Sequence, residues 1–311
     1  MKVLVTGGAG FIGSHVVDAL VARGDDVSLL DDFNDYYDPA RKHGQADTGG
    51  ATIFNADLRD RDAVFAAIAA GRPDAIIHLA ARAGVRPSIQ DPRLYIDTNI
   101  TGTLHILDTA VAHGVAKLVI ASSSSVYGNN PKVPFAEHDR LDSIISPYAM
   151  TKQATETLAR MHADQHGLAV TALRFFTVYG PRQRPDLAIA KFLDRIATGH
   201  PIELYGDGST SRDYTYVTDI VDGVLAALDR LRPGFRVYNL GGDHPVTLRE
   251  LVEAVERTVG RTADINWLPP QTGDVDRTWA DLTLARAELD YSPKTPLTDG
   301  LRRQWAWQQD A

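Results

Sequence analysis

A tyrosine and a lysine four residues apart, Tyr148 and Lys152, are the residues of this sequence whose types and spacing most directly suggest chemistry. They follow Ser146 and Pro147, which are typical of the cap and the first position of an α-helix. Residues four apart share one helix face, so the ammonium would stand beside the phenol. The ammonium and the positive helix start would both lower the pKa of Tyr148 and make it a general base. The alternative is a tyrosine and a lysine that merely pack together.

Length and composition exclude several classes of function. A chain of 311 residues is long enough for one large domain or two modest ones. Its formal net charge of -8 provides no basic surface, so we expect neither nucleic acid nor a membrane as a partner. The sequence contains no cysteine, which excludes disulfides and zinc–thiolate sites, and we predict no metal site. Because we find no signal-peptide pattern and no apolar run of about 20 residues, we expect a cytoplasmic protein.

A glycine turn near the start of the chain indicates a dinucleotide site. An apolar strand at 3–5 runs into this turn, and an apolar-periodic helix follows it. Gly7 would permit the tight turn, Gly10 would let the backbone approach a pyrophosphate, and Gly13 would allow close helix packing. The next strand ends in Asp31, whose carboxylate would take ribose hydroxyls and repel a 2'-phosphate. The pattern therefore predicts NAD rather than NADP.

Strands and helices continue to alternate, which predicts parallel strands covered on both faces. We expect a strand at 75–81, a long helix from about Pro92 to His113, and a surface loop at 35–50. We also expect Thr247 and Glu250 to form a capping box that opens a helix to about Val259. Asp57 could contact an adenine or equally cap the next helix. The full set of predicted cofactor contacts is Gly7, Gly10, Phe11, Ile12, Gly13, Asp31, Asp32, Asn34, Asp57, Leu58, Leu79, Ala80, Ala81, Asn99, Tyr148, Lys152 and Phe175.

Several motifs in one order resemble the extended short-chain dehydrogenase/reductase superfamily, and within it the nucleotide-sugar epimerases and dehydratases. The motifs are Thr6-Gly7-Gly8-Ala9-Gly10-Phe11-Ile12-Gly13, Ser-Ser-Val-Tyr-Gly at 124–128, Tyr148-x-x-x-Lys152, Arg212-Asp213-Tyr214 and Gly273-Asp274. The resemblance covers essentially the whole chain. It implies that Tyr148 is the catalytic base, that Lys152 binds the nicotinamide ribose, and that Ser123 orients the sugar hydroxyl that is oxidised.

The pattern and the resemblance together predict an α/β fold: a Rossmann-type doubly wound parallel sheet with a smaller, discontinuous α/β substrate-binding domain. The NAD-binding domain would take residues 1–176 and about 214–240, and the UDP-sugar-binding domain about 177–213 and 241–311. The resemblance also implies a homodimer formed through the helices that begin near Pro92 and Pro147.

The residues before Val-Tyr-Gly distinguish the reactions of such proteins. Members that dehydrate a 4-keto sugar resemble one another in having Asp-Glu there, and those that decarboxylate to UDP-xylose have Glu. This chain has Ser124 and Ser125. Without an added acid or base, a bound 4-ketone has nothing obvious to do except take its hydride back. We therefore predict epimerisation at C4, in which the 4-keto sugar rotates and is reduced on its other face.

The segment at 175–186, Phe-Phe-Thr-Val-Tyr-Gly-Pro-Arg-Gln-Arg-Pro-Asp, resembles UDP-glucuronate 4-epimerases, as does the segment at 31–38. A uronate carboxylate needs donors, which hydroxyls and an arginine could supply. The predicted substrate contacts are Ser124, Ser125, Thr177, Arg184, Tyr205, Arg212, Asp274 and Arg277. The two arginines Arg212 and Arg277 would bind the diphosphate of UDP, whereas Tyr205 could lie on the uracil or belong to the core.

Two other functions stay open. UDP-galactose and N-acetylhexosamine epimerases commonly have Asn where Thr177 stands, so a UDP-glucose or UDP-N-acetylglucosamine 4-epimerase is the first alternative. A non-catalytic NAD-sensing regulator is the second, although binding alone would not need Ser123, Tyr148 and Lys152 together.

Overall fold

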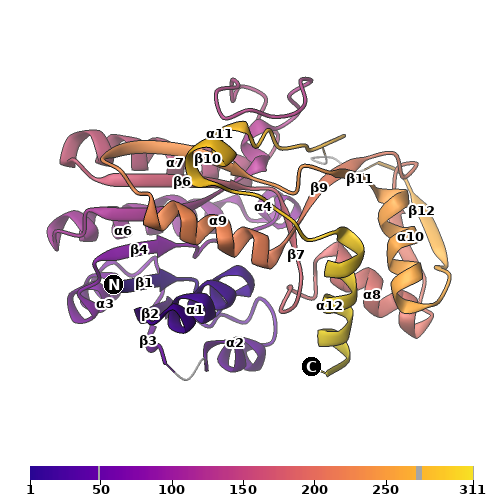
Figure 1. The fold of residues 1–311 in the computed structure, drawn as a ribbon, viewed down its shortest axis with the longest axis horizontal. Helices are drawn as coiled ribbons and strands as arrows, with labels where there is room; N and C mark the ends of the chain where they lie inside the picture. The colour runs from indigo at the N-terminus through magenta and orange to yellow at the C-terminus, as the bar shows by residue number, and fades with distance from the viewer. Residues whose placement is uncertain (48–49, 271–274, 311) are drawn as a thin grey trace.

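The large sheet of this protein has seven strands, all parallel (Figure 1). The structure is a computed structural model that describes residues 1–47, 50–270 and 275–310. From edge to edge the strands are β10 (Gly234–Leu240), β6 (Ala169–Phe175), β5 (Lys117–Ser123), β4 (Ala75–His78), β1 (Lys2–Thr6), β2 (Asp26–Asp31) and β3 (Thr52–Asn55). The chain builds outward from β1 to β3 and then returns to place β4 on the other side of β1. This reversal confirms the predicted doubly wound sheet and leaves a crevice at the strand ends, where such sheets bind ligands.

Alternate residues of β1 show how both faces of the sheet are covered. Val3 and Val5 belong to one hydrophobic cluster and Leu4 to another. The first cluster takes in α1 (Phe11–Arg23), α2 (Pro39–Ala46), α9 (Val217–Asp229) and α11 (Thr283–Leu289). The second takes in α3 (Arg61–Gly71), α6 (Gly102–Ala112) and α7 (Pro147–His166). A strand buried on both faces needs apolar residues at successive positions, which explains the apolar runs in the sequence.

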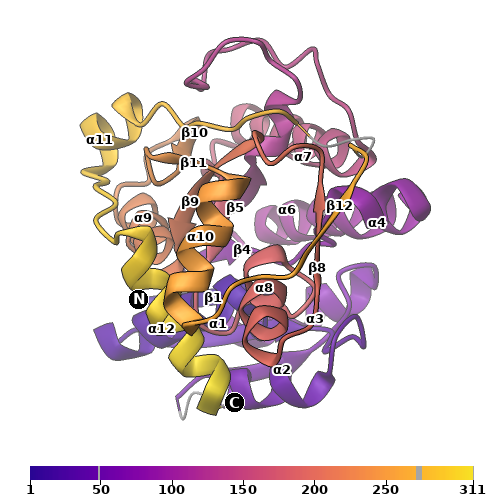
Figure 2. The ribbon, with the colours of Figure 1, turned by 90° about the vertical axis from the view of Figure 1, so that its right-hand side faces the viewer.

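A smaller region lies beside the large sheet in Figure 1 and faces the viewer in Figure 2. It contains a three-stranded sheet of β11 (Pro245–Thr247), β9 (Ser211–Tyr216) and β7 (Thr177–Tyr179), and a two-stranded sheet of β12 (Ile265–Leu268) and β8 (Ile202–Tyr205). Its helices are α8 (Ala188–Thr198), α10 (Leu248–Val259) and α12 (Leu297–Asp310). Between β9 and β11 the chain returns to the large sheet as α9 and β10. The domain boundaries stay a prediction, because β9 ends at Tyr216 and α9 begins at Val217 without a linker.

Two predicted helix starts are confirmed. Ser146 caps α7 by accepting a hydrogen bond from the Ala149 amide at 3.2 Å, with Pro147 in the first turn. Thr247 and Glu250 form the reciprocal capping box that opens α10. These caps depend on residues within one turn, which is why the sequence alone revealed them. Among the helices of the described residues, none is both long enough and apolar enough to cross a membrane.

The prediction of a surface loop at 35–50 is wrong over its centre. Helix α2 occupies Pro39–Ala46 and begins at Asp38, whose side chain accepts from the Ala40 amide at 2.9 Å. The segment lacks apolar periodicity because two of its buried residues, Lys42 and Gln45, are polar. Tertiary contacts therefore stabilise a helix that the hydrophobic pattern does not reveal.

Two other elements differ from their predicted form. The helix expected from about Pro92 to His113 is continuous but has three parts: α5 (Pro92–Tyr95), the π-helix η1 (Ile96–Thr101) and α6. The predicted strand at 75–81 ends at His78, after which the chain turns away along the crevice. Two short helices remain, namely α4 (Val85–Gln90), whose first turn lines a cavity, and the 3-10 helix η2 (Ser124–Tyr127), which follows β5.

Candidate active site

The glycine turn between β1 and α1 is built for a ligand that comes close to the backbone. Gly7 has a φ of 70°, in the left-handed region that favours glycine. A Cβ on Gly13 would lie 2.0 Å from the Gly7 carbonyl oxygen, so a side chain there would disrupt the turn. Gly10 precedes α1, and no side chain caps this helix. The first-turn amides and the positive helix end therefore face the crevice, which fits a pyrophosphate.

Asp31 ties the end of β2 to this turn. Its carboxylate oxygens accept hydrogen bonds from the amides of Ala9 at 3.1 Å and Phe33 at 3.0 Å. Burial raises the pKa of Asp31, and these two amides oppose the rise. Asp32 accepts from the amide and side chain of Asn34. Two adjacent carboxylates at this strand end fit ribose hydroxyls, and their charge disfavours a 2'-phosphate.

These groups line a cavity of about 490 Å³. Its wall includes all the predicted cofactor contacts except Asn99. Asn99 lies behind the wall, where its side chain accepts from the Arg82 amide at 2.8 Å and donates to Thr151 at 3.0 Å. Asp60, not Asp57, caps α3. The Asp57 carboxylate instead pairs with Arg59. The donors, the glycine cradle and the acids of this cavity thus fit a dinucleotide.

Tyr148, Lys152 and Ser123 meet on one wall of the same cavity. The start of α7 is anchored because the Tyr148 amide donates to Ser88 Oγ at 3.1 Å. Lys152 Nζ donates to the Ala121 carbonyl at 2.8 Å, just before the strand end that carries Ser123. The Ser123 hydroxyl also acts on the Tyr148 phenol, whose pKa it lowers. The arrangement provides a phenol, a hydroxyl and an ammonium around one point of the cavity.

The predicted lowering of the Tyr148 pKa is wrong for this structure. Burial raises the pKa of Tyr148, against the opposing effects of the Ser123 hydrogen bond and the charge of Arg184. Burial also lowers the pKa of Lys152 to about 8, with the Glu156 carboxylate opposing it. Desolvation disfavours the charged form of each group, and it outweighs the favourable partners that the helix spacing suggested.

A second cavity of about 1420 Å³ adjoins the first, and the two share Gly84, Thr177, Arg184 and Tyr214 in their walls. Of the predicted substrate contacts, Thr177 and Arg184 line both cavities, and Tyr205 and Arg212 line the second cavity. The ring of Tyr205 is covered by Arg86, whose guanidinium carbon lies 4.7 Å from the ring centroid.

Some predicted substrate contacts are not brought to these walls. Among the described residues of the two walls, Ser124, Ser125 and Arg277 are absent. Ser124 and Ser125 belong to η2, although Ser125 Oγ accepts from Ser123 at 3.1 Å. Arg277 is exposed, in a strand bridge with Ser211. Asp274 lies outside the described residues.

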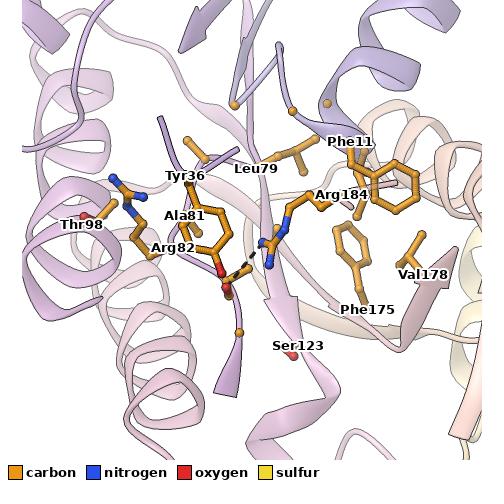
Figure 3. A pocket seen from close by; sticks show the side chains of 18 of the residues that line it. Phe11, Tyr36, Leu79, Ala81, Arg82, Thr98, Ser123, Phe175, Val178 and Arg184 are labelled. Atoms are coloured by element: carbon orange, nitrogen blue, oxygen red, sulfur yellow. Dashed lines mark hydrogen bonds between the residues drawn. The ribbon is translucent and has the colours of Figure 1, made fainter. Parts of the chain in front are cut away.

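Tyr36 and Arg184 meet over the first cavity from different parts of the chain (Figure 3). The Arg184 guanidinium carbon lies 4.9 Å from the centroid of the Tyr36 ring. Tyr36, Arg82, Thr98, Gln183 and Tyr214 line cavity walls but were missed in the sequence analysis. Tyr36 belongs to the segment at 31–38 and Tyr214 to the motif at 212–214, so these two motifs were the sequence signals for them. Among the described residues no cluster of three or more His, Cys, Asp or Glu could hold a metal ion.

Comparisons with known proteins show the family to which the chain belongs. A model of the NAD dependent epimerase/dehydratase family matches residues 3–241. A probable UDP-glucuronate 4-epimerase of Rhizobium meliloti is 41% identical, over 99% of this chain and 96% of that protein. A solved UDP-glucuronic acid 4-epimerase of Bacillus cereus, with UDP-glucuronic acid and NAD, has a TM-score of 0.92, 33% identity and coverage of 100% and 99%. A Thermus thermophilus UDP-glucose 4-epimerase with NAD also has a TM-score of 0.92, at 35% identity and full coverage of both chains.

Proposed function

Because this chain belongs to the NAD dependent epimerase/dehydratase family, we propose that it is a UDP-glucuronate 4-epimerase that interconverts UDP-glucuronate and UDP-galacturonate. The observation that carries the proposal is the position of Arg184. Its guanidinium is mostly buried, with 16% of the side chain exposed, and it borders both the cofactor cavity and the adjoining larger cavity. A buried cation at that junction suits a substrate with a carboxylate on its sugar.

The residues of the first cavity divide the work of the reaction. Ser123 orients the C4 hydroxyl. Tyr148, as a phenolate that the Lys152 ammonium stabilises, accepts the C4 hydroxyl proton as the sugar is oxidised to a 4-ketone. NAD, held by the glycine turn and the acids at the end of β2, would supply the hydride acceptor and donor for the reaction. Lys152 holds the nicotinamide ribose and keeps a positive charge near the Tyr148 phenolate. When the ketone turns over and is reduced on its other face, Tyr148 returns the proton and the C4 epimer results.

The carboxylate of the substrate imposes a further demand. Oxidation of glucuronate at C4 creates a β-keto acid, which loses carbon dioxide when its C–C bond aligns with the carbonyl π system. Thr177 and Arg184 both border the two cavities, which supports the proposal that they hold the carboxylate out of that alignment. Thr177→Val should therefore release more UDP-pentose per turnover than the wild-type protein. Unchanged UDP-pentose release by an active variant would contradict this role.

The decisive experiment compares three substrates. Purified protein is incubated separately with UDP-glucuronate, UDP-glucose and UDP-N-acetylglucosamine, with added NAD, and the products are separated by chromatography. We expect UDP-galacturonate from the first and little product from the others. Conversion of a neutral sugar without conversion of UDP-glucuronate would establish the alternative epimerase instead. NAD binding with no conversion of any sugar would support the regulator.

We also propose a cytoplasmic homodimer. Four large apolar side chains remain 37% to 48% exposed on α4, η1 and α7: Ile89, Ile96, Met150 and Met161. A second copy that packs its own helices against α4, η1 and α7 would bury such side chains. Light scattering of the purified protein tests the dimer, and a monomer at micromolar concentration would exclude it.

A further inference from the structure

A third functional side chain continues the row that Tyr148 and Lys152 begin on α7. Glu156 follows Lys152 by four residues, so all three lie on one helix face. Lys152 and Glu156 are 5% and 6% exposed, so a charged row runs from the cavity into the interior. A buried carboxylate without partners would be strongly unfavourable, and its partners therefore show what it does.

Glu156 is held rigidly by the strands beneath α7. Its Oε1 accepts from Ser122 Oγ at 2.5 Å, and Ser122 adjoins Ala121, whose carbonyl accepts from Lys152. Ala121 and Ser122, which are neighbours in β5, thus hold Lys152 and Glu156 on two successive turns of α7. Arg174 lies in β6, opposite Ser122 of β5. Its Nε and Nη2 groups donate hydrogen bonds to the Oε1 and Oε2 atoms of Glu156 at 2.9 and 2.8 Å.

The Arg174 guanidinium also has hydrogen-bond partners on the side away from Glu156. Its Nη1 donates to Tyr127 Oη at 2.9 Å, and Tyr127 in turn donates to Asn239 at 2.7 Å. Arg174 is 3% exposed. The Glu156 carboxylate is therefore held at a fixed place by Arg174 and Ser122, and Glu156 lies one helical turn from Lys152 on α7.

We propose that Glu156 is a positioning residue for the oxidation, whose carboxylate keeps Lys152 charged and directed at the nicotinamide ribose beside Tyr148. This inference rests on the proposed oxidation at Tyr148 but not on which UDP-sugar is the substrate. The charged and titratable neighbours of Lys152 agree with it. Tyr148 precedes Lys152 on α7, and His78 faces it from β4, where burial and the Lys152 charge lower the pKa of His78 to about 3. His78 is thus neutral, and Glu156 is the neighbour that favours the ammonium.

The test is the pH dependence of Glu156→Gln. Without the carboxylate the ammonium is lost at lower pH, so the alkaline fall in turnover should begin about one pH unit earlier than in the wild type. NADH binding, followed by its fluorescence from pH 6 to 10, should weaken over the same earlier range. This second measurement needs no sugar, so it tests the inference even if the proposed substrate is wrong.

Glu137→Gln is the matched control. Glu137 Oε1 accepts from the Asn239 amide at 2.8 Å, at the far end of the same network, and its carboxylate does not adjoin Lys152. Glu137→Gln should leave the alkaline fall of turnover and of NADH binding at the same pH as in the wild type. If Glu156 served only as the ion-pair partner of Arg174, Glu156→Gln would leave the pH dependence of turnover and of NADH binding unchanged, as expected for Glu137→Gln.

Folding is separated from charge by two further variants. Glu156→Gln leaves Arg174 buried without its partner, so Glu156→Gln with Arg174→Gln removes both charges while keeping polar side chains. This double variant should show the same early alkaline fall. Arg174→Lys keeps the carboxylate but loses the fork, and it should lower the melting temperature with the alkaline curves unmoved. Wild-type curves for either folded Glu156→Gln protein, in turnover or in NADH binding, would overturn the inference.

Discussion

Arg184 and Asp186 form a bidentate ion pair, with guanidinium Nε and Nη2 at 2.9 and 2.7 Å from the two carboxylate oxygens. Tyr36 Oη donates to the same carboxylate at 3.4 Å, and Arg184 Nη1 reaches the Ala83 carbonyl at 3.5 Å. A guanidinium has five N–H donors, so these contacts leave two for a ligand. The pair therefore sets the direction of Arg184 without consuming its capacity to bind an anion.

Arg184→Lys tests this geometry. Lysine keeps the charge but lacks the fork, so it loses the paired hydrogen bonds to Asp186 and the stacking on Tyr36. We expect KM for UDP-glucuronate to rise about tenfold, which corresponds to about 1.4 kcal/mol. Any turnover of UDP-glucose should change by less than about twofold. Arg182→Lys is the control, because Arg182 lies in the same loop but pairs with Asp18 at 2.6 Å. Equal losses for both sugars would argue against carboxylate recognition.

Tyr148→Phe removes the proposed general base and retains the ring. Loss of a positioned base typically costs a factor of about 100 to 10,000, so kcat should fall about 1,000-fold. NADH affinity should change by no more than about threefold, because the substitution removes only a hydroxyl and keeps the ring. Tyr238→Phe controls for loss of a tyrosine hydroxyl, since Tyr238 donates to Glu288 at 2.6 Å in the outer part of β10. Retention of a tenth of the activity would remove Tyr148 from this role.

Lys152→Met should stabilise the protein while abolishing turnover. Burial lowers the Lys152 pKa from 10.5 to about 8, so the folded protein holds its proton less tightly than the unfolded chain. The cost to stability is therefore full below pH 8 and disappears as pH rises to about 10.5. A pKa difference of this size is worth up to about 3 kcal/mol. Urea denaturation should show the gain at pH 7 and its loss near pH 10.

The exposed Lys117 supplies the control for that substitution. Lys117→Met removes an ammonium at the start of β5, where the side chain faces solvent. The free energy of unfolding should change by less than about 0.5 kcal/mol at either pH. A Lys152→Met protein that is less stable than the wild type at pH 7 would contradict the expected cost of the buried ammonium.

Gly13→Ala should abolish NAD binding, because the added Cβ would lie 2.0 Å from the Gly7 carbonyl oxygen and force the cradle apart. Gly44→Ala makes the same change within α2, where a Cβ meets nothing within 4 Å. That control should bind NADH normally and gain about 0.5–1 kcal/mol of stability, since alanine favours a helix interior. Fluorescence titration with NADH and thermal unfolding of both variants check the contrast.

Signals that lie within one or two turns of the chain were predictable. The glycine turn, the caps at Ser146 and Thr247 and the Tyr148–Lys152 spacing depend on neighbours in sequence, and each forms as expected. Helix α2 and the π-helix η1 were not predictable in the same way. The polar residues Lys42 and Gln45 are buried in α2, so this helix has no apolar periodicity, and η1 differs from an α-helix only in its hydrogen-bond register.

The sequence by itself determined which functional groups occur and in what order along the chain. These are a cofactor-binding glycine turn, an acid at a strand end, and a tyrosine and lysine on one helix face. Only the tertiary structure decided the ionisation of those groups and their partners. Burial, which no spacing reveals, raises the Tyr148 pKa instead of lowering it. Tyr36 meets Asp186 and Arg174 meets Glu156 across long stretches of chain. Desolvation and ion pairing depend on what surrounds a group in space, and that environment exists only in the folded protein.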